Sequence, residues 1–239
     1  NASVRYCVIT FDDGWLDNYR HAYPVLKKFD IPATIFLPTD YVGSDQWFWP
    51  DQLALLFKIL AARKVTPEAV RELRKLFGAY FDGHGDPFVA AMERGDHVAD
   101  RIIEHCKHLP IERIHALVTA LATWLEVSLP QERVIVNWDE VREMSREGVS
   151  FGSHSCSHRI LTTITLEDVS IELTRSRQVL LEQGVNYVPV FCYPNGNSDA
   201  NIQHLVQVCG YEAACSVRMG VEGRIPENKY AFRRVGIHN

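Results

Sequence analysis

The feature that most constrains the fold of this chain is an apolar run that ends in two adjacent carboxylates and a glycine. Residues 8–11 read Val-Ile-Thr-Phe, and Asp12, Asp13 and Gly14 follow directly. An apolar run before a turn signal indicates a buried strand, and glycine allows the chain to turn where the strand ends. We therefore expect both aspartates at the carboxyl end of a strand in a parallel sheet. Because two like charges this close repel each other, the pair indicates a nearby cation.

Further candidate metal ligands lie far downstream, in a segment that reads Ser-His-Ser-Cys-Ser-His. His154 and His158 follow a short predicted strand at 149–152, as the aspartates follow the first strand. One carboxylate and two imidazoles are a ligand set of hydrolytic zinc sites, and the second carboxylate is left to act as a base. Cys156 stands between the histidines and is expected to face away from both, so we do not count it as a ligand.

Each of these signals has a simpler explanation when it is taken alone. An Asp-Asp-Gly sequence after a strand is also typical of a solvated turn, and two histidines four residues apart on a helical turn can be a surface coincidence. The aspartate motif of haloacid dehalogenase phosphatases begins similarly, but it needs one residue between its acids, and Asp12 and Asp13 are adjacent. The combination of the two segments, each after a predicted strand, favours the metal site.

Most of the chain alternates between predicted strands and predicted helices. Asn137 and Thr165 begin two of the helices as capping residues, and Gly148 and Gly184 follow their ends. The predicted strands are 4–11, 33–37, 149–152, 188–193 and 212–217, and the helices are 15–29, 138–147, 166–183 and 199–209. This alternation is typical of an α/β fold, either a (β/α) barrel or a doubly wound sheet, with every candidate site residue just past a strand.

A helical insertion separates the second predicted strand from the third. From about residue 45 to about residue 130 the apolar residues recur with a helical period, in three stripes. Thr66 and Pro67 begin the second of these helices as its N-cap and first helical residue. We interpret residues 1–239 as one catalytic domain that carries this insertion as a helical subdomain or cover, and no residue in it is a candidate for chemistry.

The composition narrows the range of partners. The formal net charge of −5 and the isoelectric point near 6.1 provide no basic field for nucleic acid or an anionic membrane, so neither is expected as a partner. No run approaches the roughly 18 apolar residues that a membrane span needs. No charged-then-apolar signal peptide opens the sequence, which starts with Asn1 and not with Met.

The cysteine pattern indicates the compartment only weakly. The chain has six cysteines and no C-x-x-C pair, and Cys7, Cys192 and Cys215 lie in predicted strands, where a free cysteine behaves as a small buried hydrophobe. We therefore expect a reducing compartment, the cytoplasm. A periplasmic or envelope protein with one or two disulfides is the alternative.

Three motifs carry a resemblance to a known family. Residues 10–14 read Thr-Phe-Asp-Asp-Gly, residues 154–158 read His-Ser-Cys-Ser-His, and residues 193–196 read Tyr-Pro-Asn-Gly. The chain resembles the polysaccharide deacetylases of carbohydrate esterase family 4, the NodB-homology domain, whose motifs are T-F-D-D-G, H-S/T-x-x-H and, in one form of the third, Y-P-Y/N-G. The resemblance extends from residue 4 to about residue 214 without the helical insertion. It implies a distorted (β/α) barrel with fewer than eight regular units.

The resemblance also implies an activity and a role for each site residue. Asp13, His154 and His158 would hold one divalent metal, for which Zn²⁺ suits the ligand types, and Asp12 would be the general base. The backbone N–H of Asn195 would stabilise the oxyanion. The implied reaction is metal-dependent hydrolysis of the N-acetyl group of an amino sugar, in a polysaccharide, an O-antigen intermediate or a lipid-linked glycan. Trp15 is expected to line the pocket.

Two departures from the family pattern leave other functions open. The arginine that many relatives use to orient the base is Cys192 here, and the late L-x-H motif that supplies a general acid has no clear counterpart. His238 is the nearest candidate for that acid. One alternative is a non-catalytic carbohydrate-binding relative, although the presence of all four metal and base residues argues against it. The other is a metal-independent amidohydrolase that cleaves another C–N bond.

Overall fold

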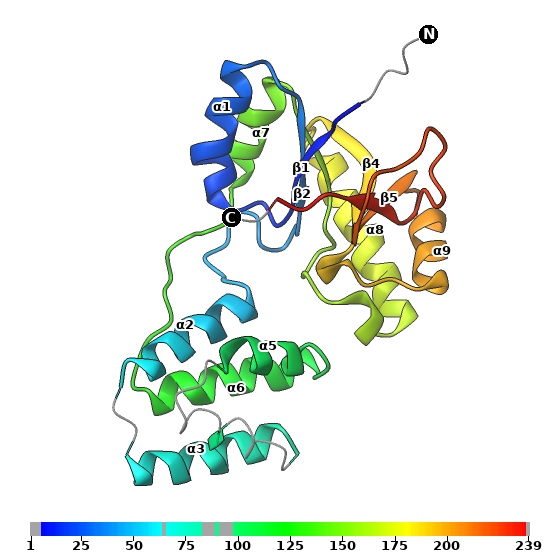
Figure 1. The fold of residues 1–239 in the computed structure, drawn as a ribbon. Helices are drawn as coiled ribbons and strands as arrows, with labels where there is room; N and C mark the ends of the chain where they lie inside the picture. The colour runs from blue at the N-terminus through cyan, green and yellow to red at the C-terminus, as the bar shows by residue number, and fades with distance from the viewer. Residues whose placement is uncertain (1–5, 64–65, 83–88, 91–97, 238–239) are drawn as a thin grey trace. The chain divides into compact units, whose positions relative to one another are not determined.

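The computed structural model describes residues 6–63, 66–82, 89–90 and 98–237. The chain divides into two compact units, and Figure 1 shows the helices and strands of each. The first unit is formed by Asn1–Gln46 with Glu132–Asn239, and the second by Trp47–Gln131. The division falls close to the limits that the sequence predicts for the helical insertion. The interpretation of both units as one catalytic domain stays a prediction.

The first unit is built on a parallel sheet whose strands lie side by side in chain order. Each strand pairs in parallel with the next one along the chain. The strands are β1 (Ile9–Phe11), β2 (Ala33–Leu37), β3 (Val149–Ser153), β4 (Tyr187–Cys192), β5 (Ala213–Met219) and β6 (Phe232–Arg234). Although β1 and β6 are the two edges, Arg234 of β6 donates a hydrogen bond to Thr10 of β1 at 3.3 Å. The sheet is therefore curled into the incomplete, distorted (β/α) barrel that the sequence predicts.

Helices lie in the connections from β1 to β5, as is usual for parallel strands, whereas the connection from β5 to β6, all of which is described, contains no helix. The connections contain η1 (Asn18–Ala22) and α1 (Tyr23–Lys28), α7 (Trp138–Arg146), α8 (Leu166–Glu182) and α9 (Ala200–Val208). Asn137 and Glu140 form a complete capping box at the start of α7, and Thr165 accepts a hydrogen bond from the backbone N–H of Asp168 at the start of α8. Both helix starts were predicted from the sequence.

The first helix of this unit was predicted, whereas the two edge strands of the sheet differ from the prediction. The helix expected at 15–29 is present from residue 16 to residue 28, with the π-helix η1 in its middle, and η1 passes into α1 next to Pro24. The strand expected at 4–11 is described only from Ile9 to Phe11, and Cys7 is exposed instead of buried. Strand β6 was not predicted at all.

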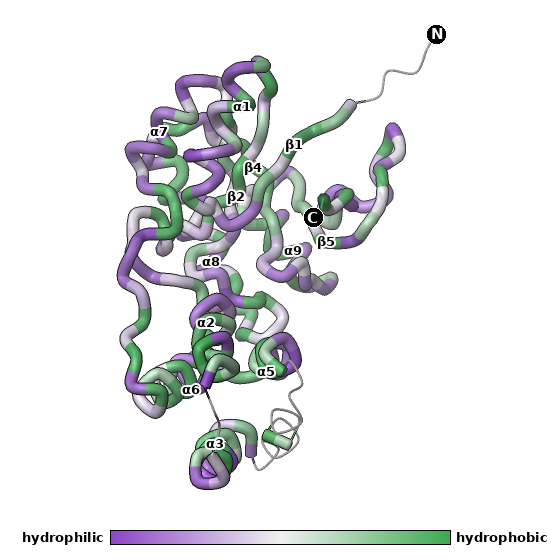
Figure 2. Tube along the Cα trace, turned by 60° about the vertical axis from the view of Figure 1, so that its left-hand side comes forward, coloured by the Kyte–Doolittle hydropathy of each residue, from purple (hydrophilic) through white to green (hydrophobic). Residues whose placement is uncertain are grey.

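The second unit is helical and has its own hydrophobic core. Its helices are α2 (Trp49–Ala61), α3 (Pro67–Tyr80), α5 (Ala99–Cys106) and α6 (Ile111–Trp124), and α5 was not predicted. Figure 2 shows that hydrophobic and hydrophilic residues alternate along the trace of these helices. The apolar faces form one buried cluster that includes Leu56, Phe77 and Leu121. Of the described helices, none has the length and apolar character needed to span a membrane.

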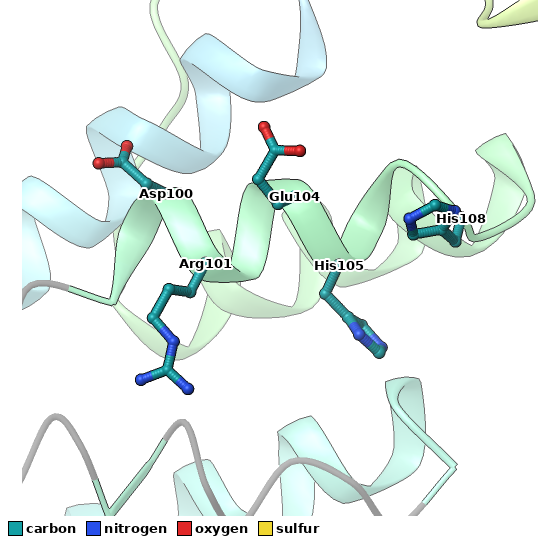
Figure 3. Close-up of a pocket in the computed structure, with 5 residues that line it drawn as sticks. All are labelled: Asp100, Arg101, Glu104, His105 and His108. Carbon is teal, nitrogen blue, oxygen red and sulfur yellow. The ribbon is translucent and has the colours of Figure 1, made fainter.

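A shallow hollow on α5 contains several titratable side chains. Figure 3 shows Asp100 and Glu104 on one side of the helix and Arg101 and His105 on the other. The ring of His105 packs edge-on against Phe81, with the ring centres 5.0 Å apart. Because these side chains diverge and His105 has a packing role, the hollow does not gather groups for chemistry.

Candidate active site

A glycine turn at the carboxyl end of β1 sets the directions of the two aspartates. Asp13 and Gly14 both have left-handed backbones, with φ of 70° and 68°, and the N–H of Gly14 donates to the carbonyl of Asp12 at 2.9 Å. A Cβ at Gly14 would lie 2.5 Å from Cδ2 of Leu37, so only glycine fits this turn. The turn thus places two adjacent carboxylates in different surroundings.

The two histidines lie on a loop after β3, not on a helical turn. Within this loop Ser155 and His158 have left-handed backbones, with φ of 66° and 57°. The segment after β2 runs beside the loop, because Thr39 N–H donates to the carbonyl of Ser155 at 3.1 Å and Asp40 N–H donates to that of Cys156 at 3.0 Å. The four-residue spacing therefore brings the imidazoles together through a loop conformation, which sequence periodicity does not describe.

Asp13, His154 and His158 converge on one point. Oδ1 of Asp13 lies 3.2 Å from Nε2 of His154 and 3.1 Å from Nε2 of His158. Nδ1 of His154 lies 2.7 Å from the carbonyl oxygen of Cys192, so this nitrogen carries a proton and Nε2 is left to face Asp13. The indole N–H of Trp15 donates to the other oxygen of Asp13, Oδ2, at 3.1 Å. Trp15 therefore fixes which oxygen faces the imidazoles.

The charges at this point are strongly coupled. Burial acts to raise the pKa of Asp13, but the hydrogen bonds with His154 and His158 outweigh it and hold the pKa far below its ordinary value. Burial acts to lower the pKa of His154, but the neighbouring Cys192 and the hydrogen bond with Asp13 raise it well above its ordinary value. For His158, burial lowers the pKa and outweighs Asp13. One imidazole thus favours the charged form beside Asp13, and the other favours the neutral form that binds metals.

These three residues fit a divalent metal ion. One atom from each side chain lies within 4.8 Å of the others, and the set combines one carboxylate oxygen with two imidazole nitrogens. Three protein ligands with room for a water or a substrate atom are the pattern of catalytic zinc sites. The carbonyl that orients His154 and the indole that orients Asp13 are the outer partners that such ligands need.

Asp12 belongs to a separate ion pair. Its two oxygens accept hydrogen bonds from the two terminal nitrogens of Arg234, each at 2.7 Å. Burial acts to raise the pKa of Asp12, but the hydrogen bond with Arg234 outweighs it and keeps the pKa below its ordinary value. Asp12, His154 and Cys192 are also close enough to hold a cation, but the guanidinium already occupies both carboxylate oxygens. We therefore take Asp13, His154 and His158 as the candidate metal ligands.

Arg234 binds a candidate site residue, and the sequence analysis gave it no role. Its Nε–H donates to the carbonyl of Ser216 at 3.1 Å, and Nη2 lies 3.3 Å from the sulfur of Cys192. The family resemblance implies an arginine at the position of Cys192, and in this structure Arg234 of β6 binds Asp12, the residue expected to act as the base. One signal could have revealed Arg234. Asp12 is partly buried, such a carboxylate needs a positively charged partner, and the sequence analysis named no cationic side chain for it. Arg233-Arg234 was a pair of arginines in the sequence without an assigned role.

Asn195 lies on the loop after β4, at the same sheet edge as the other site residues. It belongs to η3 (Pro194–Gly196) and has a left-handed backbone with φ of 56°, and Gly196 N–H donates to the carbonyl of Tyr193 at 2.8 Å. Its side chain is directed to Asn197, with a hydrogen bond of 2.5 Å. A role for Asn195 therefore falls to its backbone N–H. His238, the nearest candidate for the general acid in the sequence, lies outside the described residues.

The fold and the site define the class of this protein: an incomplete (β/α) barrel whose strand ends gather one carboxylate and two imidazoles. The sequence profile of the polysaccharide deacetylase family matches residues 1–78 and 106–214, more than half of the chain, and the chain belongs to this family. A shorter segment of 51 residues, 21% of the chain and 18% of its relative, is 45% identical to YxkH of Bacillus subtilis (strain 168), which is named for the same family.

Solved structures show the same fold at low sequence identity. The deacetylase PplD of Streptococcus pyogenes, in complex with acetate, is 16% identical, with a TM-score of 0.55 over 96% of this chain and 63% of that chain. IcaB from Ammonifex degensii is 17% identical, with a TM-score of 0.54 over 97% of this chain and 67% of that chain. This chain therefore spans less than two thirds of the length of PplD.

Proposed function

We propose that this chain is a metal-dependent N-deacetylase that hydrolyses the N-acetyl group of an amino sugar in a glycan. The observation that carries the proposal is that the two adjacent aspartates have different partners. Oδ1 of Asp13 faces both imidazoles, whereas Asp12 is held by Arg234 and is left available to accept a proton. Family membership supports the substrate class, and the glycan itself, whether polysaccharide, O-antigen intermediate or lipid-linked sugar, is part of the proposal.

In the proposed reaction, Asp13, His154 and His158 would hold a divalent ion, most simply Zn²⁺. When bound, such an ion lowers the pKa of a water molecule and polarises a carbonyl group. Asp12 accepts a proton from the attacking water, whose oxygen bonds to the carbonyl carbon of the N-acetyl group. The C–N bond then breaks, the nitrogen takes up a proton, and acetate and the free amine are released.

The other residues orient the groups that react. Arg234 keeps Asp12 ionised and directs it, because its two parallel hydrogen bonds fix the plane of the carboxylate. The backbone N–H of Asn195 stabilises the negative charge that develops on the carbonyl oxygen, a contribution of about 10²- to 10³-fold in rate for one such donor. The leaving amine also needs a proton from a general acid, for which His238 is the nearest candidate in the sequence.

The compartment also stays a prediction. The expected compartment, from the cysteine pattern of the sequence, is the reducing cytoplasm. A periplasmic or envelope location remains the alternative that the sequence leaves open.

Acetate release from an N-acetylglucosamine oligomer, measured with the purified protein before and after chelation, tests the proposal. We expect release that is lost with the chelator and restored by Zn²⁺, together with about one metal ion per chain by elemental analysis. Metal binding without acetate release from a panel of N-acetylated sugars would favour the non-catalytic carbohydrate-binding relative. Hydrolysis of an amide by the metal-free protein would favour the metal-independent amidohydrolase.

A further inference from the structure

A buried glutamate on helix α8 binds the loop that carries both histidines. Only 8% of the surface of Glu172 is exposed. Its Oε2 accepts hydrogen bonds from the backbone N–H groups of Cys156, at 2.7 Å, and Ser157, at 2.9 Å. Its Oε1 accepts a further hydrogen bond from the hydroxyl of Ser157. All three donors therefore come from the two residues that separate Ser155 from His158.

The surroundings of Glu172 indicate that the role of its carboxylate is to accept those three hydrogen bonds. A buried carboxylate is costly unless it is paired or fully hydrogen-bonded. Arg175, on the same helix, forms its ion pair with Asp40 at 2.8 Å instead, and the ion pairs of the described residues do not include Glu172. The hydrogen bonds that its carboxylate accepts in the described part of the chain come from this loop.

The loop itself needs such support, because its backbone is strained. Ser155 and His158 are non-glycine residues with φ of 66° and 57°, a region that L residues rarely adopt. Local hydrogen bonds stabilise part of the turn, since Oγ of Ser155 accepts from the N–H of His158 at 3.0 Å. Residues held in such conformations persist only where the surrounding structure determines them, and they concentrate at functional sites.

Helix α8 holds the end of β3 as well as the loop. Ser176, one helical turn after Glu172, shares a hydrogen bond of 2.7 Å with the hydroxyl of Ser153, which precedes His154. On its other side, the loop is bound by the backbone of Thr39 and Asp40. The peptide groups around both histidines are therefore fixed from two elements that do not themselves contribute metal ligands.

We propose that Glu172 is a positioning residue for the metal site: it holds the loop so that His154 and His158 present their Nε2 atoms to Asp13 before the ion binds. The inference rests on the metal site of the proposed function. Outer partners of metal ligands typically change metal affinity by 10- to 100-fold when they are lost. Glu172 meets the ligands only through the loop and is separate from the reacting atoms.

The substitution Glu172→Gln tests this role with little change in shape. A carboxamide has one acceptor oxygen, and its NH₂ group would face the donors of the loop. We expect the dissociation constant for Zn²⁺, measured by competition with a chromophoric chelator, to rise by about 10- to 100-fold. The matched control is Glu167→Gln, in the exposed first turn of the same helix, for which we expect the wild-type constant. The variant Ser157→Ala removes one donor, and we expect a smaller rise, of about threefold to tenfold.

Further readouts separate positioning from a general loss of structure. We expect saturating Zn²⁺ to restore the kcat of Glu172→Gln while KM for the glycan stays at the wild-type value. If Glu172→Gln does not fold, as judged by circular dichroism, Ser157→Ala decides, and an unchanged affinity for Zn²⁺ overturns the inference. Wild-type affinity in both variants overturns it as well and leaves the proposed function standing. A wild-type protein that does not bind Zn²⁺ overturns the proposed function, and the inference with it.

Discussion

At the scale of single residues, the site separates two carboxylates that are neighbours in the sequence. Asp13 faces two imidazoles and an indole N–H, and Asp12 faces a guanidinium. Both are partly exposed, with 27% and 30% of their side-chain surfaces accessible. The difference between them is therefore one of partners, not of burial, and the turn at Gly14 creates it.

The first prediction concerns the arginine on β6. Lysine in its place keeps the positive charge but cannot bind both oxygens of Asp12 in one plane. We expect Arg234→Lys to lower kcat by about 10²-fold, the lower range for a positioned general base, with an unchanged dissociation constant for Zn²⁺. Arg233→Lys is the matched control, because Arg233 pairs with Glu222 away from the site and should leave kcat unchanged. Wild-type turnover by Arg234→Lys would exclude a role for this arginine in orienting the base.

The second prediction concerns the turn itself. Gly14 and Gly184 have nearly the same left-handed φ, 68° and 64°, but a Cβ at Gly184 would meet nothing within 4 Å. We expect Gly184→Ala to lose about 1–2 kcal/mol of unfolding free energy, the cost of the left-handed backbone alone. Gly14→Ala should lose more, because its Cβ also overlaps Leu37, and should bind Zn²⁺ more weakly. Urea unfolding of both variants measures the difference, and equal losses would argue against a close fit at this turn.

The motif residues of the site could be predicted from the sequence, and their partners could not. Asp13, His154 and His158 are recognisable because ligand types and motif spacing are local properties of the chain. Arg234 and Glu172 act across the fold, and no local pattern marks them, since each becomes a partner only through tertiary pairing. The loop conformation of the histidines was missed for the same reason.

At the scale of elements, helices with capping residues were predicted well and weakly patterned segments were not. The capping box of α7 is complete, whereas β6 consists of three residues, too few to show an alternating pattern. The first helix follows a helical period as far as Phe29, but the backbone of η1 takes a wider turn that periodicity does not distinguish. Tertiary contacts determine the backbone conformation of such segments. The local sequence pattern therefore gives little indication of that conformation.

The third prediction concerns the start of α7, which lies beside the aspartate turn. Val136 N–H donates to the carbonyl of Gly14 at 2.9 Å, and Asn137 then caps the helix by accepting from the N–H of Glu140, also at 2.9 Å. We expect Asn137→Ala to lower the unfolding free energy by about 1 kcal/mol, the usual cost of a lost cap. Thr66→Ala, which removes the cap of α3 in the other unit, is the matched variant. Hydrogen exchange should rise around residue 14 only in Asn137→Ala, and an equal rise there in both variants would contradict a local link between cap and turn.

At the scale of the whole molecule, each of the two units has its own hydrophobic clusters, and the candidate site residues belong to one unit. The apolar cluster around Leu56 and Phe77 consists of residues of the helical unit, and the clusters around Phe191 and Phe36 consist of residues of the barrel unit. All the candidate site residues belong to the barrel unit. The proposed metal ligands and the proposed base therefore all come from the barrel unit.

The fourth prediction follows from this division. A ligand that binds only the folded state stabilises it by about 2.7 kcal/mol at a free concentration 100 times its dissociation constant. Because the proposed metal ligands extend from β1 and β3, we expect Zn²⁺ to slow hydrogen exchange in these strands and in the loop at 154–158, with little change in α2 and α6. His158→Asn should lose most of this protection while keeping the exchange rates of α6. Equal protection of both units by Zn²⁺ would mean that they open together, and no protection in the wild type would mean that the three side chains do not bind the ion.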